Sequence, residues 1–150
     1  MRPEDEIIDA ASLDKLVPKS LDDVIREHRD HAELRFANDA DLAPMLADVP
    51  HDSDAQNIRS WSIVTLDWRP PGMKHDRQTV IFGDHTTKGA SYRTSPLMKI
   101  DKRTWCVRTM SGTLYHLLGP ESRDPDLFRI CNWVWRTGVG KHLGVLPIFY

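Results

Sequence analysis

Opposite charges occupy different parts of this chain, and this segregation constrains its fold more than any other feature. Residues 1–55 hold fifteen Asp and Glu against six Lys and Arg, a formal charge of −9. Residues 56–150 hold fourteen Lys and Arg against seven Asp and Glu, a formal charge of +7. Eleven of the twelve aromatic residues also follow residue 56, which places the hydrophobic core there. We therefore predict two parts, an acidic segment over 1–55 and a basic domain over 56–150.

Bulk composition predicts one small globular protein. The chain has 150 residues, 40% of them hydrophobic, and five tryptophans, which suffice for a core. Its first residues are acidic, and no run reaches the roughly eighteen apolar residues of a membrane span. These features predict a cytoplasmic location with reduced thiols. Two cysteines without a Cys-x-x-Cys spacing do not make a metal site by themselves. We expect a cytoplasmic protein with no membrane partner, and the sequence leaves its oligomeric state open.

The acidic segment has the hydrophobic periodicity of helices. Apolar residues recur at helical spacing over 7–17 and over 21–37, which predicts two helices. A third, short helix is predicted from Asp39 or Asp41 to Val49. The polar, turn-rich run that follows Val49 marks the boundary with the basic domain. These helices form the predicted acidic helical arm.

The basic domain has the pattern of short β segments. Five segments joined by turns are predicted, at 61–68, 79–82, 97–100, 104–110 and 113–118, with a loop at 83–89. Such a meander curls into a small barrel or a strongly bent sheet. A helix is predicted from Asp124-Pro125 to Gly138, and the apolar tail 144–150 is expected to dock. The predicted fold is α+β, with an acidic helical N-terminal arm, a five-stranded antiparallel barrel-like sheet and a C-terminal helix.

One stretch of the basic domain carries a family resemblance. Its pattern is Thr94-Ser95-Pro96-Leu97, Ile100-Asp101, Trp105-Cys106-Val107-Arg108-Thr109, Ser111-Gly112 and Tyr115-His116-Leu117. This pattern resembles the C-terminal hairpin of short, mostly uncharacterised bacterial β proteins, chiefly alphaproteobacterial and often plasmid- or phage-linked. The resemblance covers residues 94–118 and implies a fold rather than an activity.

Catalytic chemistry has few candidates in this sequence. His75-Asp76 and Asp84-His85 flank the second β segment, and a His–carboxylate pair can orient an imidazole as a general base. Ser111 is the nearest candidate nucleophile, but Ser111-Gly112 is also what a tight hairpin turn requires. The serine lacks the Gly-x-Ser-x-Gly context of a nucleophile elbow. We assign no catalytic residue and keep a small hydrolase as the third hypothesis.

A metal site is not predicted either. His28 and His31 lie one helical turn apart and could share a metal ion with a nearby carboxylate. No third ligand is identifiable from the sequence, and Arg29 would repel a cation. We therefore predict no metal site and no cofactor.

Basic residues of the second part are the candidate binding residues. They are Arg69, Arg77, Arg93, Lys99, Lys102, Arg103 and Arg108, with Tyr115, Trp68 and Tyr92 as aromatic platforms. Small barrels bind single strands of nucleic acid through a positive groove and exposed aromatic rings. The same residues also fit a solvated face with its aromatic rings in the core, so both interpretations stay open.

The favoured function is non-enzymatic. We predict a small regulatory or accessory binding protein whose basic β surface contacts nucleic acid or an acidic protein partner. In one hypothesis, the acidic segment folds over this surface and competes with a polyanion. The alternative function is an inhibitor whose acidic helices imitate nucleic acid toward a host protein that handles nucleic acids. A simpler interpretation is that the two parts pack together, with exposed ion pairs contributing about 0–1 kcal/mol each.

Overall fold

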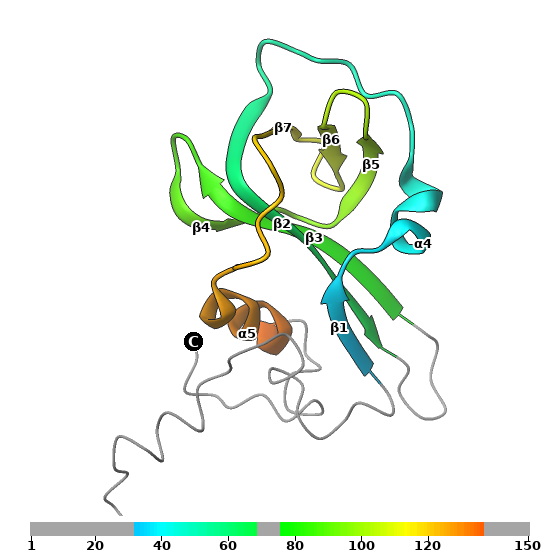
Figure 1. Ribbon diagram of the computed structural model, residues 1–150, viewed down its shortest axis with the longest axis vertical. Helices are drawn as coiled ribbons and strands as arrows, with labels where there is room; N and C mark the ends of the chain where they lie inside the picture. The colour runs from blue at the N-terminus through cyan, green and yellow to red at the C-terminus, as the bar shows by residue number, and fades with distance from the viewer. Residues whose placement is uncertain (1–31, 69–75, 137–150) are drawn as a thin grey trace, which may run out of the picture.

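The computed structural model describes residues 32–68 and 76–136 (Figure 1). Its elements are β1 (Ala32–Phe36), α4 (Asp39–Leu42), the 3-10 helix η1 (Ala43–Met45), β2 (Gln56–Trp68), β3 (Asp76–His85), β4 (Gly89–Arg93), β5 (Leu97–Asp101), β6 (Cys106–Thr109), β7 (Leu114–Leu118) and α5 (Leu127–Arg136). The predicted helix at 7–17, residues 21–31 of the next one and the tail 144–150 lie outside the described residues. No helix in the described ranges is long and apolar enough to cross a membrane.

The seven strands form one sheet of mixed orientation. Its main path runs β4-β3-β2-β7-β6-β5, and β1 also pairs with β2. The pairing of β2 with β7 is parallel, and the other pairings are antiparallel. Because β3 follows β2 along most of its length, the other edge of β2 is shared between β7 at Gln56–Arg59 and β1 at Val64–Trp68. The long strand β2 therefore organises the whole sheet.

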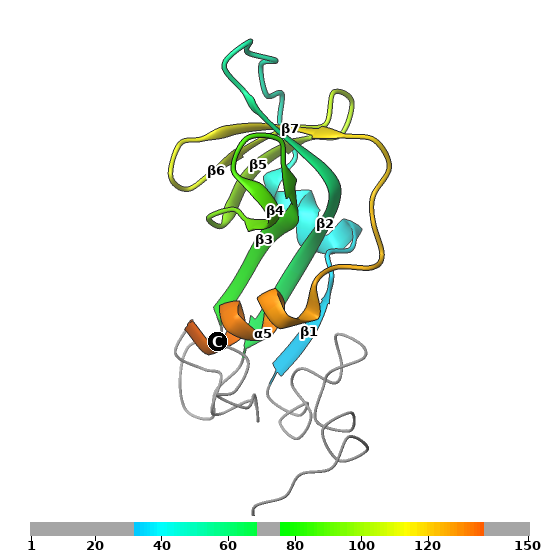
Figure 2. The ribbon, with the colours of Figure 1, turned by 90° about the vertical axis from the view of Figure 1, so that its left-hand side faces the viewer.

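A bulge bends β2 near its middle. Ser60 has a positive φ of 50°, and the register with β3 shifts between Arg59 and Ser62. A bulge of this kind kinks a strand and increases its twist. The strands β5, β6 and β7 thereby run crosswise to β2 and β3 at one end of the molecule, while α5 crosses the sheet at the other end (Figure 2). The sheet curls strongly but stays open.

The two central strands are covered on both faces. Val64 and Val80 belong to a core that they share with β1 and α5. Ile63 and Ile81 belong to a second core, shared with β5, β6 and β7. Since successive side chains of a strand point to opposite faces, each face meets its own core. Residues 61–66 are consequently buried without interruption, in place of the alternation of a half-exposed strand.

The predicted five-stranded antiparallel barrel with an acidic helical arm is wrong. The sheet has seven strands in mixed orientation and does not close. Residues 32–36, part of the predicted helix 21–37, form β1 and pair with β2. Ala32 and Leu34 are buried whereas Glu33 is exposed, which is a two-residue period. Pairing with β2 therefore outweighs the helical periodicity, since tertiary contacts override weak local propensity.

The predicted third helix, Asp39 or Asp41 to Val49, is also much shorter than expected. The chain forms only α4 and η1 there, and Leu46 is already extended. Pro44 lies in the first turn of η1, and its lack of an N–H and its steric demands prevent a continuous α-helix through this point.

Several other local predictions agree with the structure. Strands β5, β6 and β7 and the helix α5 occupy segments predicted to be strand and helix, respectively. Asp126 caps α5, because its Oδ1 accepts hydrogen bonds from the amides of Phe128 at 3.1 Å and Arg129 at 3.3 Å. The predicted loop at 83–89 is wrong at both ends, where β3 continues to His85 and β4 begins at Gly89.

Candidate anion-binding site

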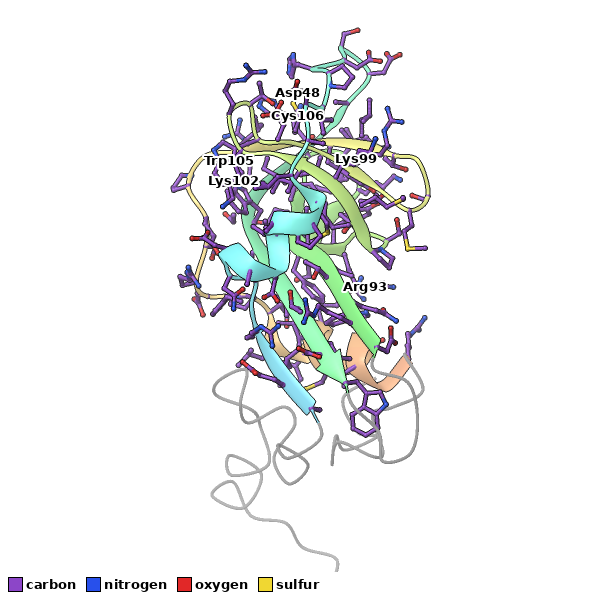
Figure 3. The ribbon with its side chains drawn as sticks, turned by 90° about the vertical axis from the view of Figure 1, so that its right-hand side faces the viewer. Asp48, Arg93, Lys99, Lys102, Trp105 and Cys106 are labelled. Atoms are coloured by element: carbon purple, nitrogen blue, oxygen red, sulfur yellow. The ribbon has the colours of Figure 1, made fainter. Side chains whose placement is uncertain are left out.

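Arginine side chains from β4 and α5 converge on one hollow. Arg93 is the last residue of β4. Arg129, Asn132, Trp133 and Arg136 follow one another at i, i+3, i+4 and i+7 on α5, which places them on one side of the helix. Together these five residues line a hollow of about 110 Å³. Figure 3 shows Arg93 toward the end of the molecule that carries α5.

Ser91 holds α5 against β4 and so positions these arginines. Its hydroxyl donates to Asp126 Oδ2 at 2.7 Å, and its carbonyl accepts from Arg129 Nε at 2.7 Å. Ser91 has a positive φ of 58°, a strained conformation for a residue other than glycine. The contacts of Ser91 with the N-terminal turn of α5 maintain this conformation. They also occupy the carboxylate of Asp126, which caps the helix and binds the serine.

The charges in the hollow are not compensated by described residues. None of Arg93, Arg129 and Arg136 forms an ion pair with an acidic side chain in residues 32–68 or 76–136. The pKa of Arg93 is lowered, first because the guanidinium is partly buried and then because Arg129 and Arg136 add positive charge. Three like charges therefore share a small space.

The hollow presents positive charge rather than an exposed aromatic ring. Trp133 is only 3% exposed, and its ring packs edge-on against Phe82 with ring centroids 5.8 Å apart. It closes one wall but presents no open face for a base to stack on. The remaining polar groups are three guanidinium groups and the amide of Asn132. Guanidinium groups bind phosphate or carboxylate oxygens through paired N–H donors, so the arrangement suits one anionic group.

Three of the sequence-predicted cations are paired with acidic residues that precede residue 55. Lys102 Nζ lies 3.1 Å from Asp39 Oδ1, and Arg103 Nη2 lies 3.6 Å from Asp48 Oδ1. Arg77 lies 4.0 Å from Asp41 and 3.5 Å from Asp67. Part of the acidic segment therefore neutralises part of the basic surface.

Two other predicted cations lie together but apart from Arg93. Lys99 and Arg108 are directly paired across β5 and β6, and both are exposed. Figure 3 shows Lys99 apart from Arg93, toward the end of the molecule that carries Cys106. The structure thus separates the predicted stripe into different surfaces. Arg69 lies outside the described residues.

Tyr115 is placed in the core. Its side chain is 3% exposed, and its hydroxyl is 2.8 Å from that of Tyr92. The pKa of Tyr115 is raised, first by burial and then by the hydrogen bond with Tyr92. A ring in this position presents no face to a nucleic-acid base.

The groups considered for catalysis are not assembled among the described residues. Ser111 Oγ lies near the hydroxyls of other turn residues, at 3.0 Å from Ser95 and 3.1 Å from Thr113. His85 Nδ1 accepts hydrogen bonds from the amides of Thr87 at 3.1 Å and Lys88 at 3.0 Å. His85 therefore organises its own turn, while His75 and the pair His28 and His31 lie outside the described residues.

Arg129, Asn132 and Arg136 were missed by sequence reasoning. Their signal was present in the chain, because arginines seven residues apart lie on one side of any helix. What the sequence could not supply was the meeting of this side of the helix with the end of β4. Comparisons of the chain with protein-family models, with curated proteins and with solved structures found no match.

Proposed function

We propose that this protein binds nucleic acid by its phosphate backbone, with Arg93, Arg129 and Arg136 as the phosphate-binding residues. The observation that carries this proposal is the convergence of three guanidinium groups on one hollow without a described acidic partner. Their mutual repulsion is relieved when an anion occupies the hollow. Arginine suits this task because it stays charged and its planar donors match phosphate oxygens.

Nucleic acid fits this site better than an acidic protein for two reasons. The hollow of about 110 Å³ is small and polar, and it offers no apolar groove for the side chains of a partner protein. The segment 56–150 has a formal charge of +7, which favours a ligand with many negative charges over a ligand with a single anionic group. Since no described residue presents an open aromatic face in the hollow, binding is expected to depend little on base sequence.

Fluorescence anisotropy of the full chain with labelled random-sequence DNA and RNA, single- and double-stranded, tests this proposal across a salt series. The variant Arg129→Gln/Arg136→Gln removes two phosphate contacts from exposed positions on α5. It should weaken binding at least about tenfold at low salt. It should also reduce the slope of log K against log[salt] by about 1.8 for duplexes and about 1.4 for single strands.

The matched control is Lys99→Gln/Arg108→Gln, which removes the same formal charge from a different surface. This control should change the affinity and the slope much less than the α5 variant. Equal effects of the two double variants would mean that only net charge matters and would refute the site. An absence of binding to all nucleic acids would refute the function. Direct binding of inorganic phosphate by a chain that binds no nucleic acid would assign the hollow to a small phosphate ligand.

A further inference from the structure

A second cluster of functional side chains lies apart from the arginine hollow. His51 belongs to the loop before β2, Cys106 begins β6 and His116 lies in β7. One potential ligand atom from each of the three residues lies within 4.8 Å of the other two. Figure 3 shows Cys106 at the end of the molecule opposite Arg93.

The register of β6 and β7 places two of these side chains together. Cys106 lies directly opposite His116 in the antiparallel pair. Leu117 N donates to Trp105 O at 2.8 Å, and Thr109 N donates to Thr113 O at 3.1 Å. Both bonds join odd-numbered residues, and hydrogen-bonded and non-hydrogen-bonded pairs alternate along an antiparallel pair of strands. The even-numbered residues Cys106 and His116 therefore form a non-hydrogen-bonded pair. In such pairs the two side chains approach each other most closely.

The third side chain is brought in by the loop that precedes β2. Ala47 N donates to Ile100 O at 3.0 Å, and Val49 N donates to Asp101 Oδ2 at 3.2 Å. These contacts fix the chain two residues before His51. The imidazole of His51 then lies edge-on to that of His116, with ring centroids 4.8 Å apart and planes at 76°. Two backbone amides that donate to the last two residues of β5 thus hold His51 near the β6–β7 pair.

Asp101 is the anchor of this arrangement. Its carboxylate accepts from the amide of Val49 and from that of Arg103 at 3.0 Å. The pKa of Asp101 is lowered, first by the hydrogen bond from Val49. The ionised carboxylate therefore joins the 47–49 segment to the turn between β5 and β6, and this turn leads directly into Cys106.

We propose that His51, Cys106 and His116 form a Zn²⁺ site. One thiolate and two imidazoles are ligands that zinc prefers, at about 2.3 Å for sulfur and about 2.0–2.1 Å for nitrogen. Tetrahedral ligands at these lengths lie roughly 3.3–3.6 Å apart. The three atoms all lie within 4.8 Å of one another, so they need to draw together by at most about 1.2–1.5 Å. His51 can supply this movement because its side chain is exposed on a loop.

The burial pattern of the cluster agrees with a bound cation. Cys106 is only 1% exposed, and its Sγ donates to the carbonyl of Thr104 at 3.9 Å. The thiol thus makes only a weak hydrogen bond there, and of the two histidines beside it His51 is exposed and His116 is half-buried. Binding of Zn²⁺ replaces the S–H proton with the metal and releases that proton. Three protein ligands leave one position for water.

Titration of the full chain with Zn²⁺ and with Co²⁺ tests the site. Co²⁺ bound to a thiolate shows a sulfur-to-metal charge-transfer absorption, which reports on Cys106 separately from other histidines in the chain. His51→Asn, His116→Asn and Cys106→Ser should each weaken metal binding about 100-fold or more. Cys106→Ser should also abolish the charge-transfer band and the proton release. His51→Asn alters an exposed side chain and should fold normally.

The matched control is Cys131→Ala, which removes the other cysteine, a buried residue of α5. This variant should keep the charge-transfer band and full Zn²⁺ affinity. The proposal is overturned if the unaltered chain shows no thiolate band with Co²⁺, or if any of the three ligand substitutions leaves the affinity unchanged. Neither result bears on phosphate binding, which uses the opposite end of the molecule and is measured without metal.

Discussion

Arg35 contacts three neighbouring carboxylates. Its Nε donates to Asp41 Oδ2 at 2.9 Å and its Nη2 to Asp67 Oδ2 at 3.2 Å, while Glu33 lies 3.2 Å from Nη1. Asp41 is 3% exposed and also accepts from the amide of Asn38 at 3.0 Å, which closes a capping box on α4. The pKa of Asp41 is lowered, chiefly by the hydrogen bonds from Arg35.

Arg35→Met should therefore lower the free energy of unfolding at pH 7 by about 3 kcal/mol, because it leaves a buried carboxylate poorly compensated. The Asp41 pKa in the folded state lies below the unfolded value of about 3.9. Its stabilisation is thus complete above about pH 4 and is lost as the pH falls further. Urea unfolding at several pH values measures this. Glu33→Gln, at a position with a 64% exposed side chain, is the control and should change stability by less than about 0.5 kcal/mol.

His85 is a buried histidine held in its neutral form. Its Nδ1 accepts hydrogen bonds from the amides of Thr87 and Lys88, so this nitrogen carries no proton. We therefore assign the proton of the neutral ring to Nε2, which lies 2.5 Å from Gln56 Oε1. The pKa of His85 is lowered, first by burial and then by the charge of Lys88. Protonation at Nδ1 would break both amide hydrogen bonds of the turn.

The stability of the protein should consequently decrease as the pH falls below about 6.5, the pKa of histidine in an unfolded chain. Above that pH the contribution of His85 is complete, because both states are neutral. His85→Gln should lose less stability between pH 7 and pH 5 than the unaltered protein, although it is less stable at pH 7. Parallel pH dependences of the two proteins in thermal unfolding would contradict this account.

Among the elements, β2 and β3 are tightly packed at the bulge. Gly83 in β3 faces this irregularity, and a Cβ placed on it would lie 2.5 Å from Ile58 Cγ2 and 2.9 Å from the carbonyl of Arg59. The second contact is with backbone, which cannot rotate away. The absence of a side chain at Gly83 therefore allows β2 to bend, and this bend directs β5–β7 across the sheet.

Gly83→Ala should lower the free energy of unfolding by about 1–3 kcal/mol through overpacking at the bulge. The measurement is chemical denaturation monitored by tryptophan fluorescence. Ala90→Ser, on an exposed position of the neighbouring strand β4, is the control and should shift stability by less than about 0.5 kcal/mol. An unchanged midpoint for Gly83→Ala would mean that the bulge adapts without cost.

For the whole molecule, the segregation of charge in the sequence becomes a set of contacts between distant segments. Asp39 and Asp48 reach Lys102 and Arg103 across more than fifty residues of chain. The carboxylates of these two pairs are almost fully exposed, at 100% and 96%. Exposed ion pairs contribute little to stability, so these contacts guide the position of the acidic segment more than they stabilise the fold.

The double variant Lys102→Gln/Arg103→Gln should thus lower the free energy of unfolding by less than about 1 kcal/mol. Added salt should reduce even this difference, because it screens exposed charges. Unfolding in low and high salt measures both effects. A loss of more than about 2 kcal/mol at low salt would show that these pairs form a stabilising network.

The sequence by itself determined where three strands of the sheet and the C-terminal helix lie. Periods of two and of about 3.6 residues are local properties, and turn residues separate the segments that carry them. For this reason β5, β6, β7 and α5 were predicted correctly. The arginines of α5 were equally readable, since their spacing is local.

Only the tertiary structure decided how these segments meet. Residues 32–36 become a strand because β2 offers them an open edge, and β7 joins the same edge in parallel. Arg93 meets α5 through Ser91, and His51 meets Cys106 and His116 through the anchor at Asp101. Such contacts join residues dozens of positions apart, and their free energy depends on the bend of β2 and the register of the strands. Local periodicity carries no information about either, so both candidate sites appear only in the folded chain.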